Sequence, residues 1–194
     1  MTIELYQNEK ISWLEMPLTE VDDPGMQKLF AKAKEVFGFI PNVFLGYTIR
    51  PTHFTHWFNH FKAVTQGEGE LTLAEREMIA VVVSNENGCL YCLVSHGADL
   101  RMKLGDPILG DRIMFDYQKA GLDEETMAIL DYAAKITMSP LDCGEGDIEY
   151  MRQLGFSDQK IFDIAECAAM YNFTNRLASA TGMMPNPEYH GMGR

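Results

Sequence analysis

The chain has few of the residues that usually carry chemistry, and it lacks long apolar stretches. Its 194 residues include only four cysteines and five histidines, and its longest uninterrupted apolar run is MIAVVV. That run is far shorter than the roughly 20 residues that a transmembrane helix needs. Basic residues are also scarce, with 16 Lys and Arg against 28 Asp and Glu, so the formal net charge is −12. These shortages argue against a membrane-spanning protein and against nucleic acid or an anionic membrane as a partner.

The rest of the composition is that of an ordinary globular domain. Hydrophobic residues make up 46% of the chain and charged residues 23%, which allows a sizeable core. No break in composition divides the chain, so we expect a single domain over residues 1–194. The opening stretch MTIELYQNEK has neither a basic leader nor an apolar segment. We therefore expect no signal peptide and a cytoplasmic location.

Strand patterns are poor, whereas helix start and stop signals recur along the chain. Pro24 and Gly38 bracket one helical pattern, with proline in the first turn and glycine after the end. Thr72 and Glu75 form a capping box ahead of EREMIAVVVSNE, so its VVV is assigned to a helix. Asn87 is a good N-cap for a helix over CLYCLVSHGADLRMKL. Similar signals predict helices that start near four further positions: Pro51, Asp106, Asp123 and Ser157.

These signals predict an all-α bundle of about seven to nine helices. The tail MMPNPEYHGMGR is expected to be loosely ordered. Two segments of equal length, Leu71–Gly97 and Phe156–Gly182, align with four identities, among them Asn87 with Asn172. The alignment suggests two degenerate helical repeats, with one half at about 40–105 and the other at about 121–182.

Three reactive side chains lie close together in NGCLYCLVSHG, residues 87–97. On a helix, Cys89, Cys92 and His96 share one face. Cys89 lies in the first turn, where the helix dipole favours a thiolate, and His96 lies one turn beyond Cys92, within reach of a proton. Glu77 precedes the motif, and a carboxylate held against His96 would orient the imidazole and strengthen it as a base. Such a cluster suits thiol redox chemistry.

The pattern of Glu77, a CxxC pair and a histidine four residues later resembles the active site of AhpD-like alkylhydroperoxidases. These belong to the carboxymuconolactone decarboxylase superfamily. The phrases IPNVF, RPTHF, NGCLYCLVSHG and YNFTNRLAS resemble its peroxidase-related subgroup over about residues 35–182. The resemblance implies an AhpD-like helical fold and a thiol-dependent peroxidase, which needs no cofactor and no metal.

The resemblance also implies roles for the individual residues. Cys92 would attack the peroxide and become a sulfenic acid, Cys89 would resolve it to a disulfide, and Glu77 and His96 would relay the proton. Family members carry a histidine before the second cysteine, where this chain has Tyr91. The dipole argument alone favours Cys89 as the thiolate, whereas the family pattern and the proximity of His96 favour Cys92.

Partners and assembly follow from the same resemblance. The expected substrate is a hydroperoxide, and the expected reductant is a dithiol or a protein. Related proteins form trimers or hexamers. The helix after Pro51 has more aromatic surface than a small monomer readily buries, which also predicts a homo-oligomer. The aromatic residues concerned are Phe54, Trp57, Phe58 and Phe61.

Other interpretations of these residues remain open. Zinc bound by the two cysteines, His96 and Glu77 has suitable ligand types. A structural helical protein, or a decarboxylase of a small lactone acid, are further alternatives. Haem attachment is excluded, because Leu93 follows the second cysteine.

Several other side chains are assigned weaker or simpler roles. Cys143 and Cys167 have no nearby partner in sequence, and Cys167 is assigned to the core. Three histidines on one helix face are read as its polar side rather than as metal ligands: His53, His56 and His60. Four residues are considered for substrate binding: Tyr91, Asn172, Asn175 and Arg176.

Overall fold

The regular structure of the protein is entirely helical in the part that can be described. A computed structural model describes residues 10–17, 21 and 23–194, so residues 1–9, in the stretch considered for a signal peptide, lie outside it. The α-helices are α1 (Pro24–Phe37), α2 (Asn42–Gly46), α3 (Pro51–Gln66), α4 (Leu73–Glu86), α5 (Leu90–Leu104), α6 (Pro107–Asp116), α7 (Glu124–Met138), α8 (Glu145–Gln153) and α9 (Asp158–Ala180). Short 3-10 turns are η2 (Tyr47–Ile49), η3 (Tyr117–Lys119), η4 (Pro140–Asp142) and η5 (Pro187–Gly191). The predicted all-α class is confirmed. Across these residues, no helix combines the length and apolarity that a bilayer crossing requires.

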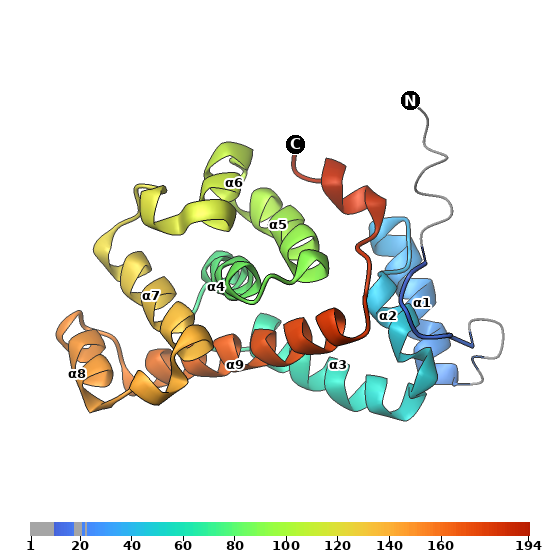
Figure 1. The fold of residues 1–194 in the computed structure, drawn as a ribbon, viewed down its shortest axis with the longest axis horizontal. Coiled ribbons are helices and arrows are strands. Elements are labelled where there is room, and N and C mark those ends of the chain that lie inside the picture. The colour runs from blue at the N-terminus through green and yellow to red at the C-terminus, as the bar shows by residue number, and fades with distance from the viewer. Residues whose placement is uncertain (1–9, 18–20, 22) are drawn as a thin grey trace.

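Helix α4 runs through the centre of the molecule, with α5, α6, α7 and α9 around it (Figure 1). The predicted capping box is present at its start, where Thr72 accepts from the Glu75 N–H and Glu75 accepts from the Thr72 N–H. Residues 76–84 are all buried. Because the side chains are apolar around most of this helix, it suits the inside of a bundle and not its surface. The VVV stretch is therefore helical and forms the middle of the core.

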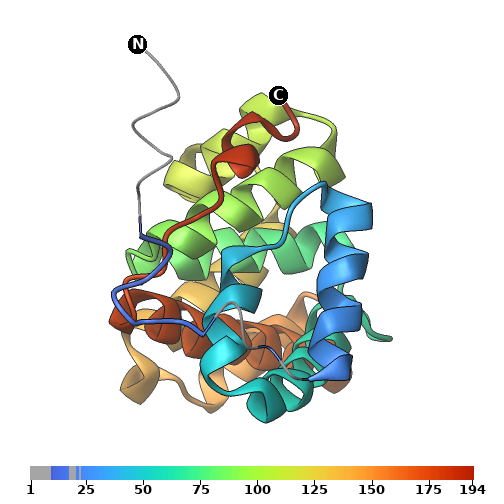
Figure 2. The same cartoon turned by 90° about the vertical axis from the view of Figure 1, so that its right-hand side faces the viewer.

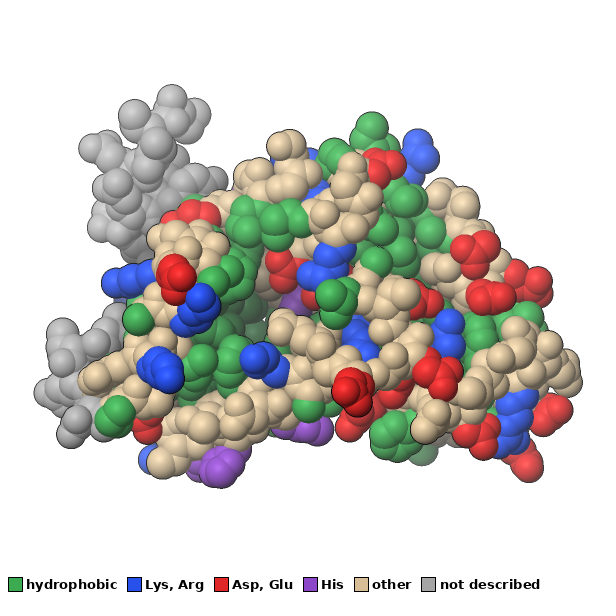
Figure 3. All heavy atoms as spheres, turned by 180° about the vertical axis from the view of Figure 1, so that it is seen from behind, with side chains coloured by type: hydrophobic (Ala, Val, Ile, Leu, Met, Phe, Trp, Pro, Cys, Tyr) green, Lys and Arg blue, Asp and Glu red, His purple; other side chains and the backbone are tan. Residues whose placement is uncertain are grey.

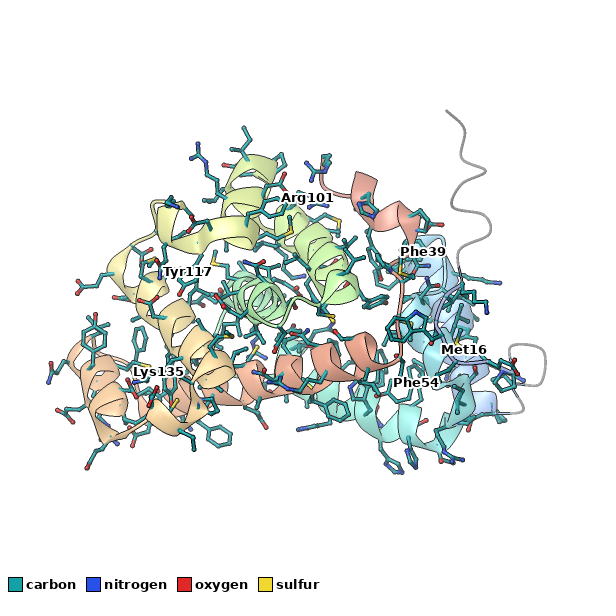
Figure 4. All side chains as sticks on the ribbon, in the orientation of Figure 1. Met16, Phe39, Phe54, Arg101, Tyr117 and Lys135 are labelled. Atoms are coloured by element: carbon teal, nitrogen blue, oxygen red, sulfur yellow. The ribbon has the colours of Figure 1, made fainter. Side chains whose placement is uncertain are left out.

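Helices α1, α2 and α3 form a second, smaller core rich in aromatic side chains. Phe54 is fully buried and packs with Phe44 at a ring-centroid distance of 5.0 Å; it lies where α3 meets α1 and α2 (Figure 4). Tyr47 and Trp57 stack at 4.8 Å. The aromatic side of α3 is thus partly covered within the chain: Phe54 is buried, and Trp57, Phe58 and Phe61 are half-buried. Helices α1 and α2 supply part of the contact surface, and Phe61 packs against the main core. The homo-oligomer stays a prediction.

The C-terminal segment is ordered, so the prediction of a loose tail is wrong. It runs back along α5 (Figure 2), where the buried Arg101 donates to the carbonyl oxygens of Tyr189, at 3.2 Å, and Met192, at 3.1 Å. Asn186 accepts from the N–H of Asn42 at 2.7 Å. A guanidinium buried on α5 needs acceptors, and the tail provides them. Near the other end of the chain, the N–H of Trp13 donates to the carbonyl of Thr181 at 3.0 Å.

The two segments aligned as repeats differ in structure. Leu71–Gly97 spans α4, a break and half of α5, whereas Phe156–Gly182 is almost entirely the single helix α9. Gly88 has φ +62°, a left-handed conformation that ends α4. The residue aligned with it, Phe173, continues the helix. The break after α4 is what places the CxxC motif at the start of a new helix.

Candidate active site

The CxxC motif begins at a helix start that differs from the predicted one. Asn87 is the C-cap of α4, and Cys89 is the N-cap of α5, with its sulfur accepting the Cys92 N–H at 3.4 Å. The prediction of Asn87 as the N-cap is wrong because Gly88 adopts a left-handed turn and delays the helix by two residues. Cys89 therefore sits at the first free N–H groups of α5, where a negative charge on sulfur is favoured.

Asparagine side chains connect the turn between α4 and α5, called the α4–α5 joint below, to α9 by hydrogen bonds. The Asn87 amide donates to the side-chain oxygens of Asn172, at 3.0 Å, and Asn175, at 2.9 Å. Asn175 is fully buried and donates to Ser84 at 3.1 Å. Arg176 is exposed and hydrogen-bonds Asn172. Of the residues considered for substrate binding on α9, none lines the cavity described below; they hold the α4–α5 joint in place.

Glu77 and His96 are brought together by the packing of α4 against α5. The distance between His96 Nδ1 and a Glu77 carboxylate oxygen is 2.8 Å, and Lys103 lies 3.6 Å from the other oxygen. Burial opposes a charge on the imidazole, but the Glu77 charge and hydrogen bond raise the pKa of His96 above its ordinary value. The Tyr171 ring packs edge-on against the imidazole, with centroids 4.8 Å apart. The Glu77 carboxylate can therefore stabilise a protonated His96 imidazole in these apolar surroundings.

The two thiols differ in their tendency to ionise. The hydrogen bond from the Cys92 thiol, with further help from the Cys92 N–H, Ser179 and His96, lowers the pKa of Cys89 to about 7 although burial opposes it. The Cys92 pKa is raised well above its usual value, first because its thiol donates to Cys89 and then by burial. The His96 charge therefore favours the Cys89 thiolate, whereas the hydrogen bond to Cys89 holds the Cys92 thiol protonated. The proximity of His96, which the sequence analysis counts in favour of Cys92, thus also supports Cys89.

Tyr91 occupies a structural position between the two cysteines. It is buried, and its hydroxyl accepts the Val43 N–H at 3.2 Å. It also hydrogen-bonds the hydroxyl of Tyr189 in the C-terminal segment. The side chain that replaces the family's histidine therefore connects the motif to α2 and to the tail.

Asp99, which the sequence interpretation did not include, completes the acidic surroundings of His96. Its pKa is raised to about 6 by burial and by the charge of Glu77, against the attraction of His96 and Lys103. Ligand atoms of Glu77, His96 and Asp99 lie within 4.8 Å of one another, and in the described part of the chain no other group of three or more potential ligands does so. The cysteines are not part of this group. The arrangement does not assemble the zinc site considered from the sequence.

A cavity of about 510 Å³ adjoins the thiols. Its walls come from α2, η2, α3, the last turns of α9 and the segments at both ends of the chain. Val43, Ala178 and Met183 line it and also pack against Cys89 and Cys92. Sequence patterns gave no sign of this cavity, because it depends on how α3 packs against α9.

The protein is thus an all-helical bundle with two cysteines at a helix start, beside a carboxylate–histidine pair. Residues 51–107 match the model of the carboxymuconolactone decarboxylase family. A peroxidase-related protein of uncharacterised function from Silicibacter sp. TM1040 is 41% identical, with a TM-score of 0.92 over 96% of this chain and 97% of that one. A second such protein from Ralstonia eutropha JMP134, described as an alkylhydroperoxidase AhpD core, is 36% identical, with a TM-score of 0.91 over 96% and 98%. The chain belongs to the AhpD-like peroxidase-related proteins of the carboxymuconolactone decarboxylase superfamily.

More distant structures share the fold alone. The debrominase Bmp8, solved in complex with 2,3,4-tribromopyrrole, is 19% identical with a TM-score of 0.75 and covers 94% of both chains. No curated protein matches the chain.

Proposed function

We propose that the protein is a thiol-dependent peroxidase that reduces hydroperoxides through a Cys89–Cys92 dithiol/disulfide cycle. Members of its superfamily are enzymes with alkylhydroperoxidase or decarboxylase-type activity. The observation that carries the proposal is the hydrogen-bonded thiol pair, with one lowered pKa, beside the His96–Glu77 pair.

The reaction begins at the sulfur that ionises first. The Cys89 thiolate attacks the terminal oxygen of ROOH, so that an S–O bond forms and the O–O bond breaks. The alkoxide that leaves takes a proton from the His96 imidazolium, whose charge Glu77 stabilises. Cys89 is now a sulfenic acid, and the Cys92 thiol gives its proton to neutral His96 as its sulfur attacks Cys89. The imidazolium passes this proton to the departing hydroxide, so that the S–O bond breaks, water leaves and the disulfide forms.

A second substrate must close the cycle. An external dithiol or a protein dithiol supplies two electrons and two protons, which restore both thiols by exchange. Such reductants belong to a reducing compartment, which agrees with the cytoplasmic location expected from the sequence.

The proposed roles of the two cysteines are the reverse of those that the family resemblance implies. Here Cys89 attacks the peroxide and Cys92 resolves the sulfenic acid. The thiolate is the nucleophile, and the lowered pKa favours Cys89. In the proposed order, Cys92 stays protonated until the sulfenic acid has formed.

Peroxide turnover with dithiothreitol as reductant tests the function and the order together. Unmodified protein should consume cumene hydroperoxide, and Cys89→Ser should not. Cys92→Ser, treated with peroxide before any dithiothreitol is added, should stop after one step, with a sulfenic acid on Cys89 that dimedone traps. Cys143→Ser, on a cysteine outside the site, should turn over like the unmodified protein. Absence of turnover in the unmodified protein contradicts the function, and dimedone labelling of Cys92 in the Cys89→Ser variant reverses the order.

The decarboxylase and zinc alternatives fit the site less well. A decarboxylase of a small lactone acid has no evident use for two hydrogen-bonded thiols. Zinc would need the cysteine sulfurs, His96 and Glu77 around one point, and their ligand atoms do not gather in this way.

A further inference from the structure

The cavity beside the thiols is much larger than a small peroxide needs. A water molecule takes about 30 Å³ in the liquid, so hydrogen peroxide needs roughly twice that volume. The cavity offers about 510 Å³, a size typical of sites for drug-sized ligands. Its walls are largely apolar, with Tyr47, Trp57, Phe173 and Leu177 among them. A cavity of this size with largely apolar walls can hold an apolar organic molecule.

One wall of the cavity packs against the cysteines. Val43, Ala178 and Met183 separate the space from the sulfurs by one layer of side chains. Thr174 also lines the cavity, and its side chain hydrogen-bonds Cys92. A ligand that lies in the cavity therefore has one end near the CxxC pair.

Basic and imidazole side chains lie where α3 begins. Arg50, His53 and His56 line the cavity and are exposed. Among the described residues that line it there is no Asp or Glu, although the chain has 28 acidic residues. On the face shown in Figure 3, acidic side chains gather over α7 and α8, at the end of the molecule away from α3. In the part of the chain that the structure describes, no salt bridge uses Arg50.

The start of α3 adds to the local positive potential. This helix has 16 residues, and no side chain caps its N-terminus. Pro51 has no N–H and the His53 N–H donates to the Arg50 carbonyl, so the helix contributes mainly its dipole, which favours an anion at this end. The dipole and the guanidinium act in the same direction, and the two imidazoles offer further hydrogen-bonding groups beside them.

We propose that the cavity binds hydroperoxides of apolar carboxylic acids, which deepens the proposed peroxidase function and rests on it. The apolar body lies against Trp57 and Leu177. The carboxylate is held by Arg50, His53 and His56, and the hydroperoxide group points toward the cysteines.

The test compares an acid with its ester in the same protein. The hydroperoxide of linoleic acid and its methyl ester differ only in the charge, so the ratio of their kcat/KM values isolates the anion contact. Unmodified protein should prefer the acid. Arg50→Gln should lower the ratio by about threefold to tenfold, the range from an exposed ion pair to a charge-assisted hydrogen bond. Arg112→Gln, at an exposed arginine on α6, should leave the ratio unchanged.

Binding of decanoate, which carries no hydroperoxide, separates this inference from the proposed reaction. Calorimetry should show decanoate bound more tightly than decanol, and this difference should shrink in Arg50→Gln but not in Arg112→Gln. Equal acid-to-ester ratios in Arg50→Gln and the unmodified protein, together with equal binding of decanoate and decanol, would overturn the inference. Arg50-dependent binding of decanoate in a protein without peroxide turnover would support the anion site and overturn the peroxidase reaction.

Discussion

Around His96, three charged side chains depend on one another for their protonation. Glu77 raises the pKa of the imidazole, the imidazolium lowers the pKa of Cys89, and the pKa of the Asp99 carboxyl rises to about 6 because of burial and the Glu77 charge. A change at one residue must therefore appear at the others. At the residue scale, the Cys89 pKa is lowered chiefly by the Cys92 hydrogen bond, and the Glu77 carboxylate on a different helix contributes through the charge of His96.

Removing the Glu77 charge should make Cys89 less reactive near neutral pH. In Glu77→Gln the imidazolium is less populated, so less positive charge favours the Cys89 thiolate. The midpoint of iodoacetamide alkylation, expected near pH 7 in unmodified protein, should rise. The rate deficit should shrink above about pH 8.5, where solvent ionises a free thiol unaided. Glu86→Gln, an exposed carboxyl on the same helix, is the matched control. Identical pH profiles for Glu77→Gln and the unmodified protein would contradict the coupling.

Asp99 should weaken the fold at neutral pH. Its carboxyl binds a proton more tightly in the folded protein, with a pKa of about 6 against 3.8 when unperturbed. The free energy of unfolding is therefore lowered as pH rises between these values, and the cost is complete above them. Asp99→Asn should be more stable than the unmodified protein at pH 8, by at most about 3 kcal/mol, with little difference at pH 3. Urea denaturation at the two pH values checks this, and equal stability at pH 8 argues against a buried charge.

At the scale of the elements, the joint between α4 and α5 positions the motif. It is held by Gly88 in a left-handed turn and by the amides of Asn87 and Asn175. Most elements could be predicted because caps are local. Pro24 starts α1 and Pro51 starts α3 as their sequence signals indicate.

The features that could not be predicted from the sequence depend on contacts between segments that are far apart in the chain. The cap moved from Asn87 to Cys89 because Asn87 is engaged by α9 and its neighbour turns left-handed. The tail is ordered because Arg101, on α5, needs acceptors. The Glu77–His96 contact could be expected only from the family resemblance, since its members lie on two helices and the angle at the break between them cannot be predicted from the sequence.

Asn175 should be important for stability although it touches no solvent. Asn175→Ala removes the partner of the buried Ser84 hydroxyl and one of the two acceptors of the Asn87 amide. Leaving a buried polar group such as the Ser84 hydroxyl unpaired costs about 1–3 kcal/mol. Asn85→Ala, at an exposed asparagine on the same helix as Ser84, should change stability by less than about 0.5 kcal/mol. Chemical denaturation of both variants measures the difference, and equal losses would contradict the role of the joint.

At the scale of the whole molecule, α9 leaves an apolar stripe exposed. Phe162, Phe173 and Leu177 are 65%, 53% and 39% exposed, and their spacing puts them on one side of the helix. Phe173 and Leu177 also line the cavity, so Phe162 is the member of the stripe that a subunit contact can use. Exposed apolar surface of this kind is common at subunit contacts. The proposal of a trimer or hexamer now rests on Phe162 and on the family resemblance, since the aromatic side of α3 is partly covered within the chain.

Light scattering should give a mass near three or six times 22.0 kDa at micromolar concentration. Phe162→Glu places a charge in the proposed contact and should shift the protein to a smaller assembly. Phe115→Glu, at a phenylalanine of equal exposure on α6, should not. A mass of 22.0 kDa for the unmodified protein would rule out the oligomer.

The most direct test of the redox assignment is a titration of the reduced protein with one equivalent of cumene hydroperoxide, followed by alkylation and peptide mapping. The expected product is a Cys89–Cys92 disulfide that dithiothreitol reverses, with Cys143 and Cys167 recovered as free thiols after denaturation. Cys167 is buried in the core, and burial raises its pKa, so it should not react. A Cys143–Cys167 link, or four unreacted thiols in a protein that carries stoichiometric zinc, would contradict the account.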